Sequence, residues 1–297
     1  MFKVSSSLLP TTIRSFSRRS VHLSAQQGFT LESGTSYEQG RPSYSTETSD
    51  LILDVFWKNI GGRNTDPSKR FHMVELGAGT GKFTESFVSH FLFTEKGQLH
   101  ITAVEPSEGF RKILVDKALH HVRAVHGTGD HIPVETHSAD AVVVAQAFHW
   151  MANTNTLKEV HRVLKPNAPL VLVWNTYDYS KEWMRIVDKE ILTPTYGDTP
   201  RQQTEKWRLC FNEPEGKKLF STIHSWYNPY NFSGDRQMVL NRFLSTSVIV
   251  QLQESEKNKV IKRLEDILDN HPDFRYARIT GKYEIPYTTH VAWVYAK

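Results

Sequence analysis

The sequence predicts an α/β protein whose sheet is doubly wound and mostly parallel. Short apolar segments alternate with segments of helical periodicity between residues 70 and 176, which is typical of βαβ units. A glycine-rich turn, E-L-G-A-G-T-G from Glu75 to Gly81, joins the first of these apolar segments to its helix. The segment 139–146 is nearly all apolar, as expected for a strand that is buried on both faces of a parallel sheet.

Seven strands and the helices between them can be placed in chain order. The expected strands lie at residues 73–76, 99–106, 121–126, 139–146, 170–174, 220–230 and 287–296. The expected helices lie at residues 51–60, 83–91, 108–117, 153–164, 183–192, 238–252 and 255–268. Ser107 stands where it can cap the third of these helices. The pattern weakens after Asn175, and we interpret the later helices as a lid over the carboxyl edge of the sheet rather than as a second core.

The glycine-rich turn has the spacing G-x-G-x-G, because Lys82 stands where the dinucleotide pattern G-x-G-x-x-G has its third glycine. Glycines let the backbone take positive φ and approach a ligand closely, and the start of the next helix offers free amide donors. Glu75 makes the turn too acidic to favour a pyrophosphate, so a cationic ligand with hydroxyl and amino groups fits better. Lys82 in place of the third glycine counts against a nicotinamide dehydrogenase. The other alternative is a tight strand-to-helix connection that binds no ligand.

Charge and composition exclude several classes of protein. The 297 residues carry a formal net charge of +4, and the basic residues that precede the first acidic residue account for all of it. These residues are Lys3, Arg14, Arg18 and Arg19. The balanced remainder does not suggest nucleic-acid binding, and no apolar run is long enough to span a bilayer. The single cysteine, Cys210, allows no intramolecular disulfide and is compatible with a reducing compartment.

The first 30 residues differ in composition from the rest of the chain. They contain serine and arginine with scattered apolar residues, and they lack aspartate and glutamate. This composition is typical of a mitochondrial transit peptide, so we expect the protein in the mitochondrial matrix. A disordered tail with a chance excess of arginine, in a cytoplasmic protein, is the alternative.

Several motifs in order resemble those of one enzyme family. The turn from Glu75 to Gly81 resembles the first motif of class I S-adenosylmethionine-dependent methyltransferases of the UbiE-like, methyltransferase type 11 group. Glu105 resembles the acid that ends their second strand. Residues 146–150 (Q-A-F-H-W) and 159–166 (E-V-H-R-V-L-K-P) resemble later motifs. The resemblance extends well over residues 35–176.

The segment 37–44 (Y-E-Q-G-R-P-S-Y) resembles an N-terminal element of a branch similar to fungal trans-aconitate methyltransferase. The sequence departs from the family at Asn167-Ala168, where a pair of glycines is usual, and this should alter only a turn. The resemblance implies a Rossmann-like methyltransferase fold with a seven-stranded sheet, a single domain over residues 31–297, and a helical lid within 177–270. It also implies S-adenosylmethionine as the cofactor and a small organic molecule as the methyl acceptor.

The resemblance assigns residues to the cofactor. Glu105 would accept hydrogen bonds from the ribose hydroxyls, although a carboxylate there can also interact with the dipole of the next helix. Glu75 and the glycine backbone would hold the methionine end, while the segment 128–129 would lie along the adenine. Asp130 would contact the adenine amine or remain a solvated carboxylate. The residues expected at the cofactor are Tyr37, Arg41, Glu75, Gly77, Ala78, Gly79, Gly81, Glu105, Thr128, Gly129 and Gln146.

Tyr37 and Arg41 allow two interpretations. An aromatic ring near a sulfonium is electrostatically favourable, and a guanidinium can bind a carboxylate through two hydrogen bonds. Alternatively, the pair is an apolar staple beside a surface arginine. We favour the functional interpretation because of the resemblance, and Arg41 would then also suit an acidic substrate.

His149 and Trp150 are the candidate catalytic residues, because they follow the buried fourth strand at the edge where doubly wound sheets bind ligands. His149 would act as a general base if the acceptor must lose a proton. Alternatively, His149 and Trp150 only form the wall of the pocket. The histidines show no metal-binding spacing, so no metal is assigned. A catalytically silent cofactor-binding assembly protein is the alternative to a methyltransferase. The sequence predicts neither the identity of the methyl acceptor nor the oligomeric state.

Overall fold

The computed structural model describes residues 40–59, 68, 70–94 and 98–297. The expected transit peptide and Tyr37 lie outside these residues. The strands are β1 (Arg70–Leu76), β2 (Gln98–Val104), β3 (Val122–Val125), β4 (Ala141–Ala145), β5 (Pro169–Tyr177), β6 (His224–Gly234) and β7 (Tyr283–Tyr295). Within the described part of the chain these seven strands form one sheet in the order β3-β2-β1-β4-β5-β7-β6.

The sheet confirms the predicted fold class. Strands β1 to β5 pair in parallel, and β7 lies antiparallel between β5 and β6. Because β2 and β3 lie on one side of β1 while β4 and β5 lie on the other, the strand order reverses between β1 and β4. Doubly wound sheets bind their ligands outside the carboxyl ends of the strands at this reversal. The glycine turn that follows β1 and the end of β4 therefore face the expected site.

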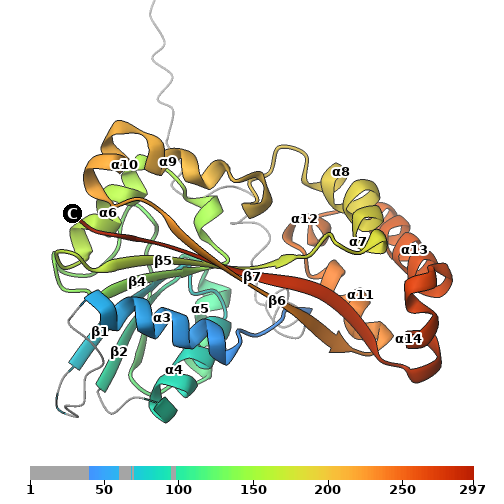
Figure 1. The fold of residues 1–297 in the computed structure, drawn as a ribbon, viewed down its shortest axis with the longest axis horizontal. Helices are drawn as coiled ribbons and strands as arrows, with labels where there is room; N and C mark the ends of the chain where they lie inside the picture. Colours follow the sequence, from blue (N-terminus) through green and yellow to red (C-terminus); the bar gives the residue numbers. More distant parts are fainter. Residues whose placement is uncertain (1–39, 60–67, 69, 95–97) are drawn as a thin grey trace, which may run out of the picture.

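Helices cover both faces of the sheet and extend beyond one end of it (Figure 1). The α-helices are α3 (Thr46–Asn59), α4 (Lys82–Thr94), α5 (Glu108–Asp116), α6 (Thr154–Val163), α7 (Glu182–Val187), α8 (Thr193–Tyr196), α9 (Leu209–Asn212), α10 (Pro214–Leu219), α11 (Arg236–Leu244), α12 (Ser247–Val250), α13 (Glu254–Asn270) and α14 (Arg275–Thr280). The 3₁₀ turns are η1 (Phe148–Trp150), η3 (Gln202–Thr204), η4 (Lys206–Arg208) and η5 (Pro272–Phe274), and η2 (Asp188–Leu192) is a π-helical turn. None of the described helices combines the length and apolar character needed to cross a membrane.

Two apolar clusters hold the sheet between its helices. On one face, α3, α4 and α5 pack against the strands, and the rings of Trp57 and Phe71 meet edge to face with centroids 4.5 Å apart. On the other face, α6, η4 and α9 pack against the alternate strand positions. Every residue of β4 is buried, which explains its continuous apolar sequence. Ser107 caps α5 as predicted, since its Oγ accepts a hydrogen bond from Phe110 N at 3.3 Å.

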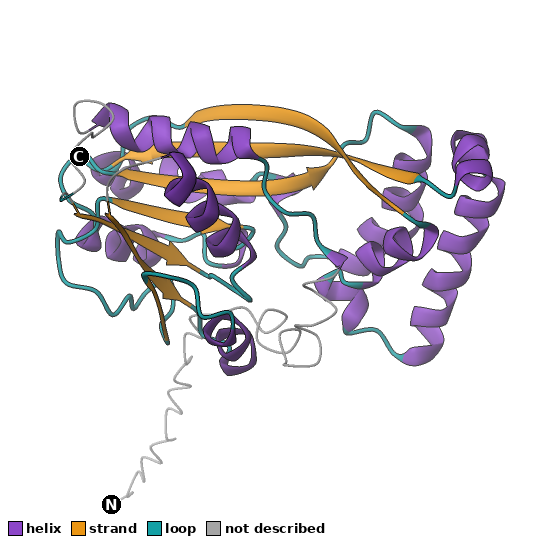
Figure 2. Ribbon diagram, turned by 90° about the horizontal axis from the view of Figure 1, so that it is seen from below, coloured by secondary structure: helices purple, strands orange, loops and turns teal. Residues whose placement is uncertain are grey.

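Most helices after residue 177 form a third apolar cluster beyond the sheet, whereas α9 packs on the sheet itself (Figures 1 and 2). Residues of α7, α11, α13 and α14 contribute to it, together with Tyr177 of β5 and Tyr287 of β7. The lid therefore contains a core of its own, which the sequence did not predict. This core is continuous with the long strands of the sheet, because β5 and β7 reach into it.

Several element boundaries in this region differ from the prediction, and the seventh strand, for example, begins at Tyr283 rather than Tyr287. The expected helix 238–252 is broken into α11 and α12, where Ser245 Oγ donates to Arg242 O at 2.8 Å and competes with the helix backbone. The expected helix 183–192 becomes π-helical from Asp188. The sixth strand begins at His224 rather than Phe220, which makes only an isolated bridge to the end of the chain.

Candidate active site

The glycine turn between β1 and α4 requires glycine for steric reasons. Gly77, Gly79 and Gly81 have φ of +73°, +60° and +82°. A Cβ at Gly77 would lie 2.7 Å from Ala147 Cβ, and one at Gly81 would lie 2.3 Å from Leu114 Cδ1. A Cβ at Gly79 would meet only Phe110 Cδ2, at an ordinary contact distance of 3.8 Å, so this backbone is less closely packed than that of the other two glycines. The turn thus presents bare backbone at the sheet edge, where a ligand can approach it.

Amide groups of the glycine turn form hydrogen bonds within the protein. The N–H groups of Gly77 and Ala78 donate to Val104 O at 2.8 and 3.1 Å, which ties the turn to the end of β2. Gly79 N donates to Glu105 Oε2 at 2.8 Å. These three amides therefore fix the positions of the turn and of the neighbouring carboxylate.

Glu105 lies at the tip of β2 and is buried. Its Oε1 accepts from Ser107 N and its Oε2 from Gly79 N, each at 2.8 Å. Burial raises the pKa of Glu105, and the hydrogen bonds from these two amides oppose the rise. The carboxylate therefore stands beside the glycine turn in a fixed orientation, as expected for an acceptor of ribose hydroxyl groups.

Glu75 lies one strand away and is almost completely buried, at 1% exposure. Its Oε2 accepts a hydrogen bond from Thr84 Oγ1 at 2.6 Å. Its Oε1 is buried and has no hydrogen-bond partner among the described residues. Burial raises the pKa of Glu75 to about 8. An acceptor oxygen without a partner at this position suits a cationic group of a ligand, such as an ammonium.

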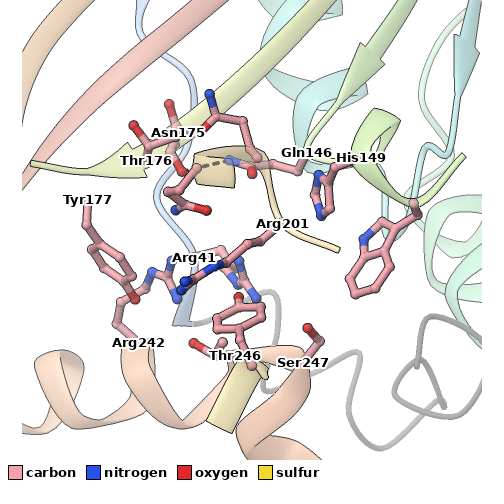
Figure 3. Close-up of a pocket in the computed structure, with 14 residues that line it drawn as sticks. Arg41, Gln146, His149, Asn175, Thr176, Tyr177, Arg201, Arg242, Thr246 and Ser247 are labelled. Atoms are coloured by element: carbon pink, nitrogen blue, oxygen red, sulfur yellow. Dashed lines mark hydrogen bonds between the residues drawn. The ribbon is translucent and has the colours of Figure 1, made fainter. Parts of the chain in front are cut away.

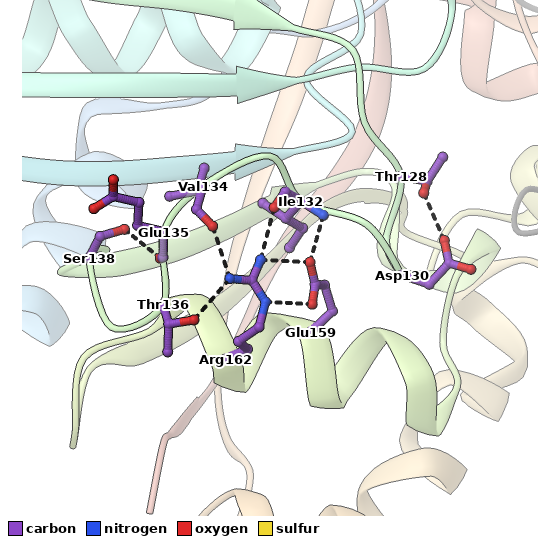
Figure 4. Close-up of polar contacts among 9 residues, drawn as sticks. All are labelled: Thr128, Asp130, Ile132, Val134, Glu135, Thr136, Ser138, Glu159 and Arg162. Atoms are coloured by element: carbon purple, nitrogen blue, oxygen red, sulfur yellow. Dashed lines mark hydrogen bonds and ion pairs between the residues drawn. The ribbon is translucent and has the colours of Figure 1, made fainter.

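The loop after β3 holds the residues expected at the adenine. Thr128 Oγ1 donates to Asp130 Oδ1 at 2.7 Å, and the backbone of Thr128 pairs with that of His131 (Figure 4). A Cβ at Gly129 would lie 2.8 Å from Thr156 Oγ1, so the loop packs closely on the start of α6. Asp130 is exposed and its contact lies within the loop, in keeping with a solvated carboxylate.

An ion pair on α6 holds the following part of this loop (Figure 4). Arg162 and Glu159 form two hydrogen bonds of 2.8 Å to each other. Glu159 Oε1 also accepts from Ile132 N at 2.8 Å, and Arg162 donates to Ile132 O at 2.9 Å and to Val134 O at 3.0 Å. Glu159 and Arg162 of the motif 159–166 thus position the loop rather than contact a ligand.

Gln146 ends β4 in a backbone conformation that is unusual for a residue with a side chain. Its φ is +59°. Its backbone N–H donates to Val173 O at 2.7 Å, and its Nε2 donates to Asn175 O at 3.1 Å. Left-handed backbone at non-glycine residues is concentrated at functional sites, and here it turns the chain from β4 toward His149.

A polar pocket lies between the sheet edge and the lid (Figure 3). The candidate residues Arg41, Gln146, His149 and Trp150 meet in its wall, although 109 positions separate the first from the last. The remaining lining residues are Asn175, Thr176, Tyr177, Tyr196, Arg201, Gln202, Gln203, Arg242, Thr246 and Ser247. Three of the described lining residues are arginines and none is aspartate or glutamate, so the pocket has a strong positive potential.

Arg242 of α11 is the most buried of these arginines, at 4% exposure. Its Nε donates to the hydroxyl of Tyr287, and its guanidinium lies 4.8 Å from the ring centroid of Tyr177. Its Nη1 is buried and has no hydrogen-bond partner among the described residues. A buried guanidinium normally has a carboxylate or another full set of acceptors, so this donor is suited to an anionic ligand.

Arg41 and Arg201 reach the pocket from other segments of the chain. Arg41 Nη2 donates to Ser245 O at 3.0 Å, which links the N-terminal segment to the lid. Arg201 Nη1 lies 3.8 Å from Asp188 Oδ1. Arg41 was expected at the cofactor, and the structure places it in the wall of this arginine-rich pocket. A second, smaller pocket shares Arg41 and Arg242 with it and is also lined by Lys82 at the start of α4.

His149 lies in η1 and is half-buried. Its Nδ1 accepts a hydrogen bond from Trp174 Nε1 at 3.2 Å. Burial, and then the positive charge of Arg41, lower the pKa of His149 to about 3. The imidazole is therefore neutral at physiological pH. The ring of Trp150 lies beside it, with centroids 4.9 Å apart, and both residues form the pocket wall.

Sequence reasoning missed the pocket residues that the lid contributes. Arg201 and Arg242 belong to segments without a recognisable motif. One signal was available for Arg242, because it lies on the same buried stripe of α11 as Val239 and Phe243. A charged residue on the apolar face of a helix suggests a buried functional group. No cluster of three or more potential metal ligands occurs among the described residues.

The chain is similar to known methyltransferases in both sequence and fold. A family model described as a methyltransferase domain matches residues 74–172. An uncharacterized methyltransferase-like protein of Schizosaccharomyces pombe is 34% identical over 241 residues, which cover 80% of this chain and 84% of that protein. An uncharacterized methyltransferase of Mycobacterium tuberculosis is 32% identical over 236 residues, again covering 80% and 84%.

Solved structures show the same fold. A type II methyltransferase of Anaeromyxobacter dehalogenans superposes with a TM-score of 0.56 at 16% identity, covering 86% of this chain and 97% of that one. A methyltransferase from an antibiotic biosynthesis pathway of Anabaena variabilis gives a TM-score of 0.55 at 15% identity, covering 86% and 98%. These superpositions show that the chain has a Rossmann-like fold. The sequence relatives show that the chain belongs to the methyltransferase family.

The cofactor of this methyltransferase is S-adenosylmethionine. The residues fit it: Glu105 can hold the ribose, Glu75 has a buried acceptor oxygen that finds no partner among the described residues, and the backbone at Gly79 is loosely packed. When bound, S-adenosylmethionine supplies an electrophilic methyl group. The protein provides the pocket beyond it, in which the acceptor must be held.

Proposed function

We propose that the enzyme methylates a small carboxylic acid on a carboxylate oxygen and releases a methyl ester. The observation that carries the proposal is the buried Nη1 of Arg242, which has no partner among the described residues and belongs to a residue that lines the pocket. A carboxylate would provide the missing acceptor and the missing negative charge together. Arg41 and Arg201 add positive charge to the same pocket, and no lining carboxylate opposes it.

The state of His149 supports an acid rather than an alcohol as the acceptor. A hydroxyl group must lose a proton during methylation, whereas a carboxylate is already ionised at neutral pH and needs no base. The low pKa of His149 and the hydrogen bond at its Nδ1 make it a poor base. The resemblance of residues 37–44 to an element of fungal trans-aconitate methyltransferases also favours an acidic substrate.

The test uses the purified full-length protein, methyl-labelled S-adenosylmethionine and a panel of aliphatic mono-, di- and tricarboxylic acids with their amides. We expect label to enter the acids but not the amides, and dilute alkali to release it as methanol. An alkali-stable product, or equal transfer to the amides, would contradict the proposal. S-Adenosylmethionine binding without transfer to any acid would favour the silent assembly protein.

Arg242→Met provides a second test, because it removes the charge and keeps much of the volume. Loss of a charged hydrogen bond of about 1.5–3 kcal/mol should raise the KM for the acid by roughly 10–100-fold. Arg236→Met is the matched control. Arg236 lies on the same helix but pairs with Asp269 and Glu265 outside the pocket, so this variant should keep the KM of the wild type.

We also propose that the protein acts in the mitochondrial matrix. The support is the composition of residues 1–30, which hold the whole charge excess of the chain and lack acidic residues. A fluorescent reporter fused to these residues should enter mitochondria. Changing Arg14, Arg18 and Arg19 to Glu should keep the fusion in the cytosol. A cytosolic wild-type fusion would refute the proposed location.

A further inference from the structure

Trp174 makes a contact with His149 that restricts the chemistry of the imidazole. The indole N–H of Trp174 donates to His149 Nδ1 at 3.2 Å. An indole nitrogen can only donate, so the nitrogen that faces it must bear a lone pair. A neutral imidazole carries one hydrogen on its two nitrogens. With Nδ1 as the acceptor, that hydrogen lies on Nε2.

The contact is held on both sides by buried elements. Trp174 is fully buried in β5, a central strand of the sheet. Its ring packs against Trp207 and His290, with centroids 4.8 and 5.6 Å away. On the other side, η1 is anchored by Phe148, which is also fully buried. Trp174 cannot turn away without disturbing the core, and the backbone of η1 that carries His149 is anchored beside it, which keeps the two residues within hydrogen-bonding distance.

We propose that Trp174 is a positioning residue that holds His149 as a neutral Nε2–H hydrogen-bond donor for an anionic oxygen of the methyl acceptor. The identity of that oxygen as a carboxylate oxygen rests on the proposed function, whereas the assignment of the donor does not. The charged side chains that line the pocket with His149 are Arg41, Arg201 and Arg242. All three disfavour an imidazolium, and the described lining residues include no carboxylate that would favour one.

This arrangement makes Trp174 a determinant of acceptor specificity, although it does not itself line the pocket. A donor at Nε2 stabilises an oxygen that already bears negative charge. The same ring cannot remove a proton from a hydroxyl group, because Nε2 carries hydrogen and the lone pair of Nδ1 is occupied by the indole. The pocket therefore selects acids over alcohols by hydrogen bonding as well as by charge.

The direct test is ¹⁵N NMR of the ligand-free protein labelled at histidine, with the His149 signals assigned from their loss in His149→Gln. We expect the Nε2–H tautomer, unchanged from about pH 5.5 to 8, because the pocket disfavours the protonated ring. In Trp174→Phe the signals should show both tautomers, still without titrating in this range, because the three arginines of the pocket remain. A wild-type protein with hydrogen on Nδ1, or one that titrates in this range, would overturn the proposal.

Trp207→Phe is the matched control. Trp207 is equally buried and packs on Trp174, but its Nε1 has no hydrogen-bond partner among the described residues. This variant makes the same change in the same cluster and should keep the wild-type tautomer of His149. Loss of the tautomer in both variants would mean that packing, not the hydrogen bond, fixes the ring. If Trp174→Phe does not fold, the wild-type spectrum still decides the assignment.

A binding measurement separates this proposal from the proposed function. Methanesulfonate is the probe, because it remains ionised throughout the pH range. We expect it to bind the wild type and Trp207→Phe with an affinity that stays constant with pH, and to bind Trp174→Phe about twofold more weakly, because only part of the His149 rings then carry hydrogen on Nε2. The Nε2–H tautomer without any methanesulfonate binding would confirm the donor and contradict the acidic acceptor. Equal affinity of Trp174→Phe and the wild type, or an affinity that rises toward low pH in the wild type, would overturn the donor.

Discussion

Replacing Glu75 by Gln should make the protein more stable at neutral pH and change how its stability depends on pH. Burial raises the pKa of Glu75 from 4.5 to about 8. Between these values the folded state keeps a proton that the unfolded state has lost, so the free energy of unfolding falls as pH rises. The slope is about 1.4 kcal/mol per pH unit, which gives ~3 kcal/mol between pH 5 and pH 7. Gln has nearly the same shape and does not titrate, so the variant loses this slope.

The assay is reversible urea unfolding of the wild type and of Glu75→Gln at pH 5, 6 and 7. The two proteins should be similar at pH 5, and the variant should exceed the wild type by ~3 kcal/mol at pH 7. Glu105→Gln is the control. Glu105 is also buried, but it accepts hydrogen bonds from two backbone amides, so its carboxylate is partly stabilised and the variant should gain less at pH 7. Stability curves of the wild type and Glu75→Gln that remain parallel from pH 5 to pH 7 would refute the reasoning.

Three further predictions concern the cofactor side of the site. Glu105→Ala should weaken S-adenosylmethionine binding by ~1–3 kcal/mol in calorimetry, without creating affinity for NAD, and unchanged affinity would remove the ribose assignment. Arg162→Met should increase amide hydrogen exchange in residues 128–134, because the carbonyl groups of Ile132 and Val134 lose their hydrogen-bond donor. An unchanged exchange rate would show that the loop does not need Arg162 to keep its conformation. Gly81→Ala should cost ~2 kcal/mol or more of stability, owing to its φ and the contact with Leu114, whereas Gly79→Ala should reduce cofactor affinity more than stability. Equal losses of stability in the two glycine variants would contradict this distinction.

The parallel half of the fold could be predicted because its strands are short apolar runs with their own turn signals. β4 is apolar throughout and proved to be buried throughout. The predictions for the other half are less accurate for a physical reason. None of the residues of β6 is fully buried, so its limits are set by pairing with β7 about 50 residues later in the chain, not by its own hydrophobicity.

The candidate site also has features that the sequence predicts and features that depend on tertiary contacts. Glu75, Glu105 and Gln146 could be identified because they end strands of a parallel sheet, whose carboxyl ends must lie at one edge. Their hydrogen bonds could not be predicted. The N–H of Gly79 faces Glu105 only because the ends of β1 and β2 are adjacent.

The sequence by itself determined a doubly wound sheet, a glycine turn at the carboxyl end of its first strand, and the acids beside it. It determined these features because they depend on local periodicity and on the order of strands along the chain. Only the tertiary structure decided that Arg242 of the lid is buried against the pocket, and that Trp174 donates to His149. Both depend on contacts between residues distant in sequence, whose burial and hydrogen bonding no local pattern encodes.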